Sequence, residues 1–265
     1  MTEHSADHRT VDDGVARISW SPELAERGWQ AAVDVVRRQV AEALTDHHRV
    51  EVKVPAGDDE ANRIATWSGL RREGVERRVT GDLVVYGRLA DDVPVHEPGG
   101  FRAILNSFLP RKRGISQMLI RAADRPVDDP HVLLCNLTYK TDWDLPGGVI
   151  EVGESPHLGV GREVEEELAL TIAPGRLLIT DWLPPWGGWD DALCLVFDGG
   201  TQPASIVERI VPQAREIRQA AFLSLAEIDE RAADFTARRI RSALAALDPT
   251  APRYTESGRE PGSGA

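Results

Sequence analysis

Two different periods of hydrophobic and polar positions follow one another along the chain and predict alternating helices and strands. Apolar residues recur at helical spacing over 28–44, whereas Val50, Val52 and Val54 occupy every second position, as in a strand over 49–55. The same two patterns predict strands at 15–21, 75–79 and 82–89 and a helix at 58–70. The first part of the chain is therefore expected to be a βαβα unit followed by strands, consistent with a right-handed crossover.

The second part of the chain contains more strand-like runs, with helical segments after them. Strands are predicted at 114–124, 132–140, 176–183, 191–198, 206–211 and 220–224, and helices at a segment ending near 169, at 225–231 and at 234–247. This order predicts an α/β fold in which a mixed sheet carries helices on its faces.

A cluster of acidic residues, prolines and glycines at 91–100 marks the best boundary between the two parts. We therefore expect a first domain at 14–92, a linker at 93–112 and a second domain at 113–248. The polar ends, 1–13 and 249–265, are expected to be disordered tails.

Composition narrows the function classes. The 265 residues are 42% hydrophobic, enough for one large or two modest cores, and the formal net charge of −12 disfavours a nonspecific nucleic-acid partner. Cys135 and Cys194 lie in apolar runs and are expected to be buried free thiols. No secretory signal and no membrane-spanning stretch is visible, so we expect a cytoplasmic protein without a membrane partner.

The negative charge is concentrated in residues 142–170. This segment has eight acidic residues against one arginine and so carries −7 of the total charge. Glu163, Glu166 and Glu167 stand at i, i+3 and i+4, which places them on one face of a helix, with Glu165 roughly opposite. Three carboxylates on one face repel one another unless cations offset them, which favours a hard divalent cation such as Mg²⁺. A solvated acidic helix face is the alternative.

The wider spacing decides between these two interpretations. Residues 148–170 resemble the signature of the Nudix hydrolase family, Gly-x5-Glu-x7-Arg-Glu-U-x-Glu-Glu-x-Gly-U with U aliphatic. Its specified positions are occupied by Gly148, Glu154, Arg162, Glu163, Val164, Glu166, Glu167 and Leu170. The sequence departs from the signature at Ala169, which replaces the final glycine. We expect the loop there to adjust and the site to survive.

The resemblance implies a Nudix α/β/α sandwich in the second domain and assigns roles to its residues. Glu163, Glu166 and Glu167, with a carbonyl of the Gly147 turn, are the implied ligands of Mg²⁺, or alternatively Mn²⁺. Gly148 belongs to the same turn, and Arg162 is expected to pair with Glu154 and hold loop and helix together.

The implied chemistry is hydrolysis of a phosphoanhydride in a nucleoside diphosphate linked to another group, such as a nucleotide sugar, an ADP-ribose-like compound or a modified nucleoside triphosphate. Mg²⁺ neutralises phosphate oxygens and acidifies water, which then attacks phosphorus. The general base is either Glu166 or a carboxylate brought in by a later loop. Glu216 is the candidate for that remote role, with Glu208 a weaker one.

Substrate contacts are less well defined by the sequence. Lys140, and less specifically the basic cluster 111–113, are candidates for contacting phosphates. Trp182 and Trp186 lie in a loop rich in proline and glycine, where an exposed indole would stack on a base. For both tryptophans the alternative is a structural role, in which they fix the loop against the sheet.

The first domain is similar to the carboxyl-terminal half of a GNAT acyltransferase over about residues 15–92. The resemblance depends on Asn62 in the second helix and on a turn with Gly69, Leu70, Glu73 and Gly74. The cofactor-binding turn departs from the family pattern, because Ala25 and Gln30 flank Gly28, and the amino-terminal half of that fold is missing. We therefore expect a truncated module that does not bind acetyl-CoA.

Two functions of other classes stay open at this point. The Nudix-like domain is either an enzyme or a noncatalytic module that senses a nucleotide, and acetyl transfer is a weaker third choice. The intact glutamate trio favours the enzyme, because a sensor need not keep three mutually repelling carboxylates. The expected partner is a small nucleotide, and a homodimer is possible.

Overall fold

A computed structural model describes residues 7–11, 14–26, 28–251 and 253–261 of the chain. It divides the chain into two compact units, residues 1–110 and 111–265. None of the helices in the described ranges is long and apolar enough to cross a membrane.

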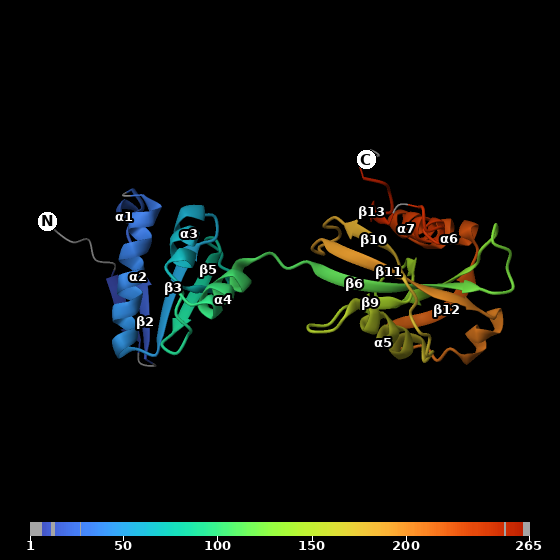
Figure 1. The fold of residues 1–265 in the computed structure, drawn as a ribbon, viewed down its shortest axis with the longest axis horizontal. Helices are drawn as coiled ribbons and strands as arrows, with labels where there is room; N and C mark the ends of the chain where they lie inside the picture. The colour runs from blue at the N-terminus through green and yellow to red at the C-terminus, as the bar shows by residue number, and fades with distance from the viewer. Residues whose placement is uncertain (1–6, 12–13, 27, 252, 262–265) are drawn as a thin grey trace. The chain divides into compact units, whose positions relative to one another are not determined.

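The first unit is a mixed sheet with helices packed on it (Figure 1). The strand order is β1-β2-β3-β5-β4, in which β2 and β3 run parallel and the other neighbours antiparallel. The strands are β1 (Asp7–Val11), β2 (Val15–Ser19), β3 (Arg49–Pro55), β4 (Arg71–Glu76) and β5 (Leu83–Leu89). The helices are α1 (Pro22–Glu26), α2 (Trp29–Asp46), α3 (Asp59–Trp67) and α4 (Pro98–Phe108).

The core of the first unit follows the two sequence periods. Val50, Val52 and Val54 of β3 are all buried, and they pack in one cluster with the apolar stripes of α2 and α3. The Asn62 side chain is structural here: it donates to the Pro55 carbonyl and accepts from the Tyr86 hydroxyl. The resemblance of this unit to a GNAT half-domain stays a prediction.

The second unit is built on a larger mixed sheet with the strand order β12-β7-β6-β11-β10-β13, in which β8 pairs with β7 and β9 with β6. The strands are β6 (Arg113–Ala122), β7 (Val132–Leu137), β8 (Trp143–Asp144), β9 (Gly147–Val149), β10 (Leu177–Leu183), β11 (Ala192–Gln202), β12 (Ile217–Leu223) and β13 (Tyr254–Glu256). The helical segments are α5 (Pro156–Leu168), η1 (Ala204–Arg209), α6 (Leu225–Arg231) and α7 (Asp234–Ala245).

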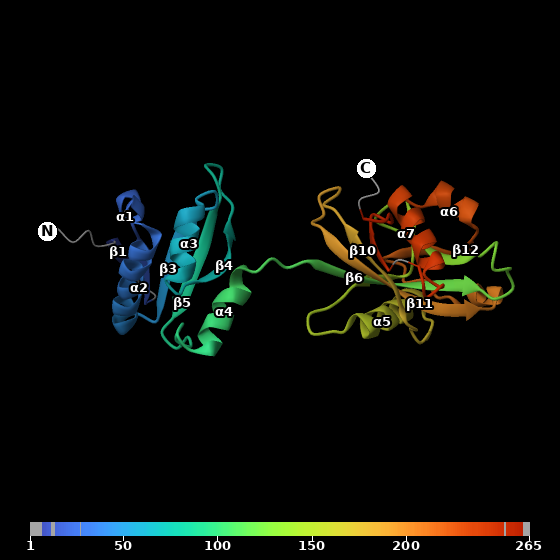
Figure 2. The same ribbon diagram turned by 45° about the horizontal axis from the view of Figure 1, so that its top comes forward.

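Helices cover both faces of this sheet: α5 lies on one side and α6 with α7 on the other, in both views (Figures 1 and 2). Alternate residues of β6 divide between the two cores, because Met118 and Ile120 pack with α5 while Leu119 packs with α7. The unit is therefore an α/β/α arrangement with a mixed sheet.

Two segments differ from the expectations above. Helix α4 occupies much of residues 93–112, which we expected to be a linker, because it buries Ile104 and contacts β4. Residues 204–209 form η1 in place of the strand predicted over 206–211, since Ile206, Val207 and Ile210 turn toward one core.

The two expected tails also contain paired backbone. Residues 7–11 form β1 and pair antiparallel with β2. Residues 254–256 form β13 and pair in parallel with β10, and Thr255 is buried. In both cases a sheet edge supplies hydrogen-bond partners that composition does not reveal.

The end of α5 shows how the departure at Ala169 is accommodated. We expected the loop to adjust, but Ala169 itself adopts the left-handed conformation, with φ 55° and ψ 32°. Its N–H still closes the last helical turn on the Glu165 carbonyl at 2.9 Å. Alanine therefore takes the strained backbone conformation that the family signature gives to glycine.

Candidate functional site

Helix α5 carries the acidic side chains, and its apolar residues fix which way they face. The Ser155 hydroxyl caps the helix by accepting from the Leu158 N–H, and Pro156 occupies the first turn. Val160 and Val164 are buried against the sheet at i and i+4. This anchoring places the acidic arc of the helix, made of Glu163, Glu166 and Glu167, along the edge of the packed face, beside β9.

The Gly147 turn faces this arc. Its φ is +132°, and a Cβ at this position would lie 2.2 Å from the Ser116 carbonyl oxygen, so only glycine fits. The Gly147 N–H donates to Glu167 Oε2 at 2.9 Å. The carboxyl of Glu163 lies against Gly148, since a Cβ there would meet it at 2.7 Å. The turn and the helix thus meet through Glu163 and Glu167.

Arg162 joins the loop before α5 to the helix. Its guanidinium donates to both Glu154 oxygens at 2.9 and 3.0 Å, so the predicted Arg162–Glu154 pair is present. It also reaches Glu166 at 2.9 Å and Glu163 at 3.1 Å. Arg162 is therefore the cation that compensates two of the three predicted metal ligands in this structure.

Glu216 comes to the same place from a distant segment. The loop before β12 is tied to the end of α5, where the Gln213 N–H donates to the Glu167 carbonyl at 2.9 Å, and to the end of β7, where the Thr138 N–H donates to the Glu216 carbonyl at 2.8 Å. These bonds place Glu216 on a cavity of about 370 Å³. The cavity is lined by Tyr139, Gly147, Gly148, Val149, Glu151, Arg162, Glu163, Glu166, Glu167, Gln213 and Glu216.

Burial and neighbouring charges raise the pKa values of several side chains in this cavity. Burial, together with the charges of Glu163 and Glu216, raises the pKa of Glu167 to about 8 against the opposing hydrogen bond from the Gly147 N–H. Burial also raises the pKa of Glu163, although Arg162 opposes the shift. Burial and the charges of Glu167, Asp144 and Glu216 raise the pKa of Tyr139 to about 12. The site therefore resists further negative charge and favours a cation.

The donor set fits a hard divalent cation in chemistry and in charge, because Glu163, Glu166, Glu167 and Glu216 offer carboxylate oxygens around one cavity. The side chains do not converge: across the described ranges, no group of three or more His, Cys, Asp or Glu residues is placed to hold a metal ion. The ion pairs of Arg162 with Glu163 and Glu166 account for part of the separation between the carboxylates, because they hold these two side chains toward the guanidinium.

The structure does not bring the predicted substrate residues into this cavity. Lys140 Nζ pairs with Asp144 at 2.8 Å. The Trp182 indole donates to Asp191 at 3.3 Å, and Trp186 packs edge-on against Phe235 while 61% exposed. Trp182 lies in strand β10 and Trp186 contacts a residue of α7, and the predicted role of the two tryptophans in binding substrate stays a prediction. Glu208, the weaker base candidate, lies exposed on η1 and away from the cavity lining.

Three polar residues of the cavity, Tyr139, Glu151 and Gln213, had no predicted role in the site. Tyr139 immediately precedes the predicted substrate residue Lys140, Glu151 lies three residues before Glu154, and Gln213 lies three residues before Glu216. The only available signal was therefore proximity in sequence to residues already named. None of the three occupies a specified position of the signature.

Comparisons with known proteins agree with the motif. The family model described as "NUDIX domain" matches residues 118–244. A relative described as a MutT-like protein, from Streptomyces ambofaciens, is 30% identical over 122 residues, which span 46% of this chain and 73% of the relative.

Solved structures with a similar fold include a MutT protein from Methanosarcina mazei Go1, at 23% identity and a TM-score of 0.43, covering 53% of this chain and 99% of that one. An ADP-ribose pyrophosphatase from Streptococcus suis 89-1591 has 20% identity and a TM-score of 0.40, and covers 55% of this chain and 99% of that one.

The family model matches only the second unit, and therefore does not test the resemblance of the first unit to an acyltransferase. Within the second unit, the matched range contains the Gly147 turn, the acidic helix α5 and Glu216. The chain thus belongs to the Nudix family, and this assignment supports a Nudix pyrophosphohydrolase.

Proposed function

We propose that the second unit is a Mg²⁺-dependent hydrolase that cleaves a phosphoanhydride bond in a nucleoside diphosphate linked to another group. One observation carries the proposal. Carboxylates from two segments separated in sequence, the helix α5 and the loop before β12, line one cavity beside the Gly147 turn.

Glu163 and Glu167 are the residues that would hold the cation most firmly. Both are largely shielded from water, and Glu167 is only 4% exposed, so their negative charge is poorly solvated without a cation. Glu166 and the Gly147 carbonyl complete the proposed ligand set. When bound, Mg²⁺ supplies charge neutralisation at the phosphate oxygens and acidifies water; Mn²⁺ is the alternative ion.

Glu216 is the proposed general base. Nothing in the described part of the chain forms a hydrogen bond or ion pair with its carboxylate, whereas Glu166 is paired with Arg162 at 2.9 Å. The Glu216 carboxylate is therefore available to accept a hydrogen bond from water, whereas a Glu166 oxygen is already occupied by the Arg162 guanidinium. In the proposed step water attacks phosphorus, the bond to the bridging oxygen breaks, and the water proton passes to a Glu216 oxygen.

Lys140, Trp182 and Trp186 remain proposals for substrate contacts beyond the carboxylate cavity. Lys140 follows Tyr139, which lines the cavity, and its ammonium would exchange Asp144 for a phosphate entering from that side. The exposed ring of Trp186 offers a surface on which a base would stack.

The test is a substrate panel with and without Mg²⁺, containing nucleotide sugars, dinucleotides, ADP-ribose and oxidised nucleoside triphosphates. We expect turnover of at least one compound, dependent on Mg²⁺, and a loss of about 10²- to 10⁴-fold in kcat for Glu216→Gln. Glu167→Gln should raise the Mg²⁺ concentration needed for half-maximal activity.

Glu165→Gln is the matched control, because Glu165 lies on the same helix but is exposed and outside the cavity lining. Its activity should stay within about twofold of the wild type. Absence of turnover on the whole panel, with thermal stabilisation by a nucleotide, would instead favour the noncatalytic sensor.

A further inference from the structure

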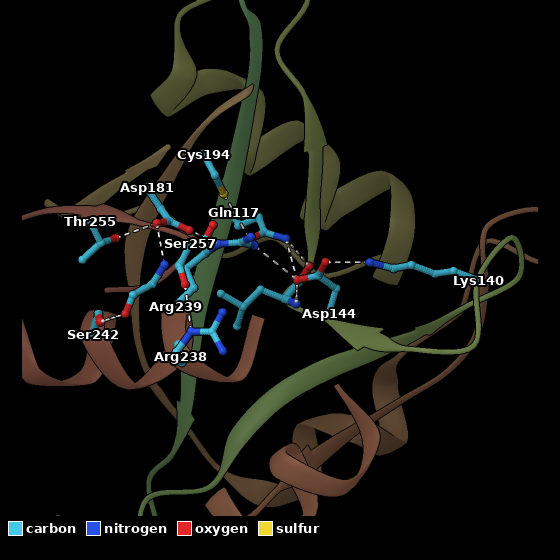
Figure 3. A network of polar contacts seen from close by, with 12 residues as sticks. Gln117, Lys140, Asp144, Asp181, Cys194, Arg238, Arg239, Ser242, Thr255 and Ser257 are labelled. Carbon is cyan, nitrogen blue, oxygen red and sulfur yellow. Dashed lines mark hydrogen bonds and ion pairs between the residues drawn. The ribbon is translucent and has the colours of Figure 1, made fainter. Parts of the chain in front are cut away.

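A buried polar network connects Gln117 and Asp144 to Arg239 of helix α7 (Figure 3). Gln117 of β6 is at its centre. The Gln117 Oε1 accepts from Arg239 Nη1 at 2.9 Å and from the Cys194 thiol at 3.2 Å. The Gln117 Nε2 donates to Asp144 Oδ1 at 2.9 Å and to the Leu145 carbonyl at 3.3 Å.

The partners allow only one orientation of the Gln117 amide. Arg239 has donors alone, and burial raises the pKa of Cys194 to about 12, which keeps its thiol a donor. On the other side, Asp144 and the Leu145 carbonyl are acceptors. A flipped amide would set donor against donor and acceptor against acceptor, at a position that is only 4% exposed to solvent.

Arg239 is itself fixed in place. It is 1% exposed, and its Nε donates to Asp181 Oδ2 at 2.9 Å, while Asp181 accepts from Thr255 and from the Gly258 N–H. Its Nη1 also lies 3.7 Å from Asp144. The guanidinium therefore cannot move without leaving a buried charge unpaired, which is strongly unfavourable.

The oriented amide holds the segment that leads into the metal-binding turn. Its Nε2 donates to Asp144 and to the Leu145 carbonyl. The Met118 N–H donates to the Pro146 carbonyl at 3.0 Å, and Gln117 is the register partner of Gly147 across β6 and β9. The next link is the Gly147 N–H, which donates to Glu167. Hydrogen bonds, together with the short backbone segment 144–147, thus connect Arg239 to the most buried carboxylate of the cavity.

We propose that Gln117, oriented by Arg239, is a positioning residue that sets the Gly147 turn against Glu167 and so shapes the cation site. Neither residue lines the cavity. This inference rests on the proposed function, because it assumes that Glu167 takes part in binding Mg²⁺.

The test compares Mg²⁺ binding to metal-free full-length variants by titration calorimetry, with stability measured in parallel. Gln117→Glu keeps the size and the acceptor toward Arg239 but turns an oxygen toward Asp144 and the Leu145 carbonyl. We expect its Mg²⁺ affinity to fall about tenfold or more, and hydrogen exchange over 144–149 to accelerate.

Thr255→Val is the matched control, because it weakens the same network at its far end, on Asp181. It should lower stability while leaving Mg²⁺ affinity within about twofold. A loss of affinity that simply follows stability in both variants would overturn the inference, as would wild-type affinity in a folded Gln117→Glu. Gln117→Met, which removes donor and acceptor without adding charge, carries the same test if Gln117→Glu does not fold.

Two results separate this inference from the proposed function. Failure of the wild-type protein to bind Mg²⁺ would overturn the proposed function and this inference with it. Binding by the wild type without slower hydrogen exchange over 144–149 would overturn the positioning role alone, since an occupied site should stabilise the turn that forms it.

Discussion

Replacing Ala169 by glycine should stabilise the second unit, although the same change weakens most helices. Ala169 has φ 55°, and an L-residue in this conformation costs roughly 1–2 kcal/mol that glycine does not. Glycine also stabilises the unfolded chain by about 0.5–1 kcal/mol, because it has more backbone freedom there, and this offsets part of the gain. The Ala169 side chain is exposed, so no core contact is lost. The expected net gain is about 0.5–1 kcal/mol.

The assay is chemical and thermal unfolding of the full-length chain without metal. A gain of this size corresponds to a rise of roughly 1–4 °C in the melting temperature of a unit of this length. Ala245→Gly is the control, since Ala245 is exposed and ends helix α7 in ordinary helical geometry. It should lower stability by up to about 1 kcal/mol. If Ala169→Gly also lowers stability, left-handed strain does not govern this helix end.

Three other perturbations test the site and its surroundings. The pKa of Glu167 is raised to about 8 from an ordinary value of 4.5, so between these pH values the folded metal-free protein keeps a proton that the unfolded chain releases. The free energy of unfolding, measured by urea titration, should therefore fall by a few kcal/mol as the pH rises through this range. Glu167→Gln should make the free energy of unfolding less dependent on pH. Thr255→Val should cost about 1–3 kcal/mol, because the hydroxyl that donates to the buried Asp181 is lost; a change below 0.5 kcal/mol in thermal unfolding would contradict this. Gly147→Ala should abolish activity and lower stability, since its Cβ would lie 2.2 Å from a carbonyl oxygen. Gly153→Ala is the control: it has open space around it and should lower the free energy of unfolding by only about 1 kcal/mol. Equal effects of the two substitutions would refute the steric argument.

Regular elements of the chain were predictable where one face is buried and the other is not. Strand β3 spans 49–55 as its alternation predicts, because every second residue must enter the core. Helix α5 was predictable from the spacing of its glutamates and from the Ser155 cap. Segments such as η1 and α4 were mispredicted, since short apolar runs and a Pro-Gly start fit several local structures, and packing chooses among them.

The local part of the site follows from the sequence. The spacing of Glu163, Glu166 and Glu167 fixes their common helix face, because this relation depends only on helical geometry over a few residues. The pairing of Arg162 with Glu154, which the family resemblance implies, joins the helix to the loop before it. The packing of distant segments brings Glu216, the candidate that the sequence offered, to these carboxylates; it also brings Gln117 to Arg239 and Thr255 of β13 to Asp181, two contacts that the sequence did not indicate. Such contacts join segments far apart in the chain, so they depend on the complementarity of whole surfaces and on the pairing of buried polar groups, which no local period records.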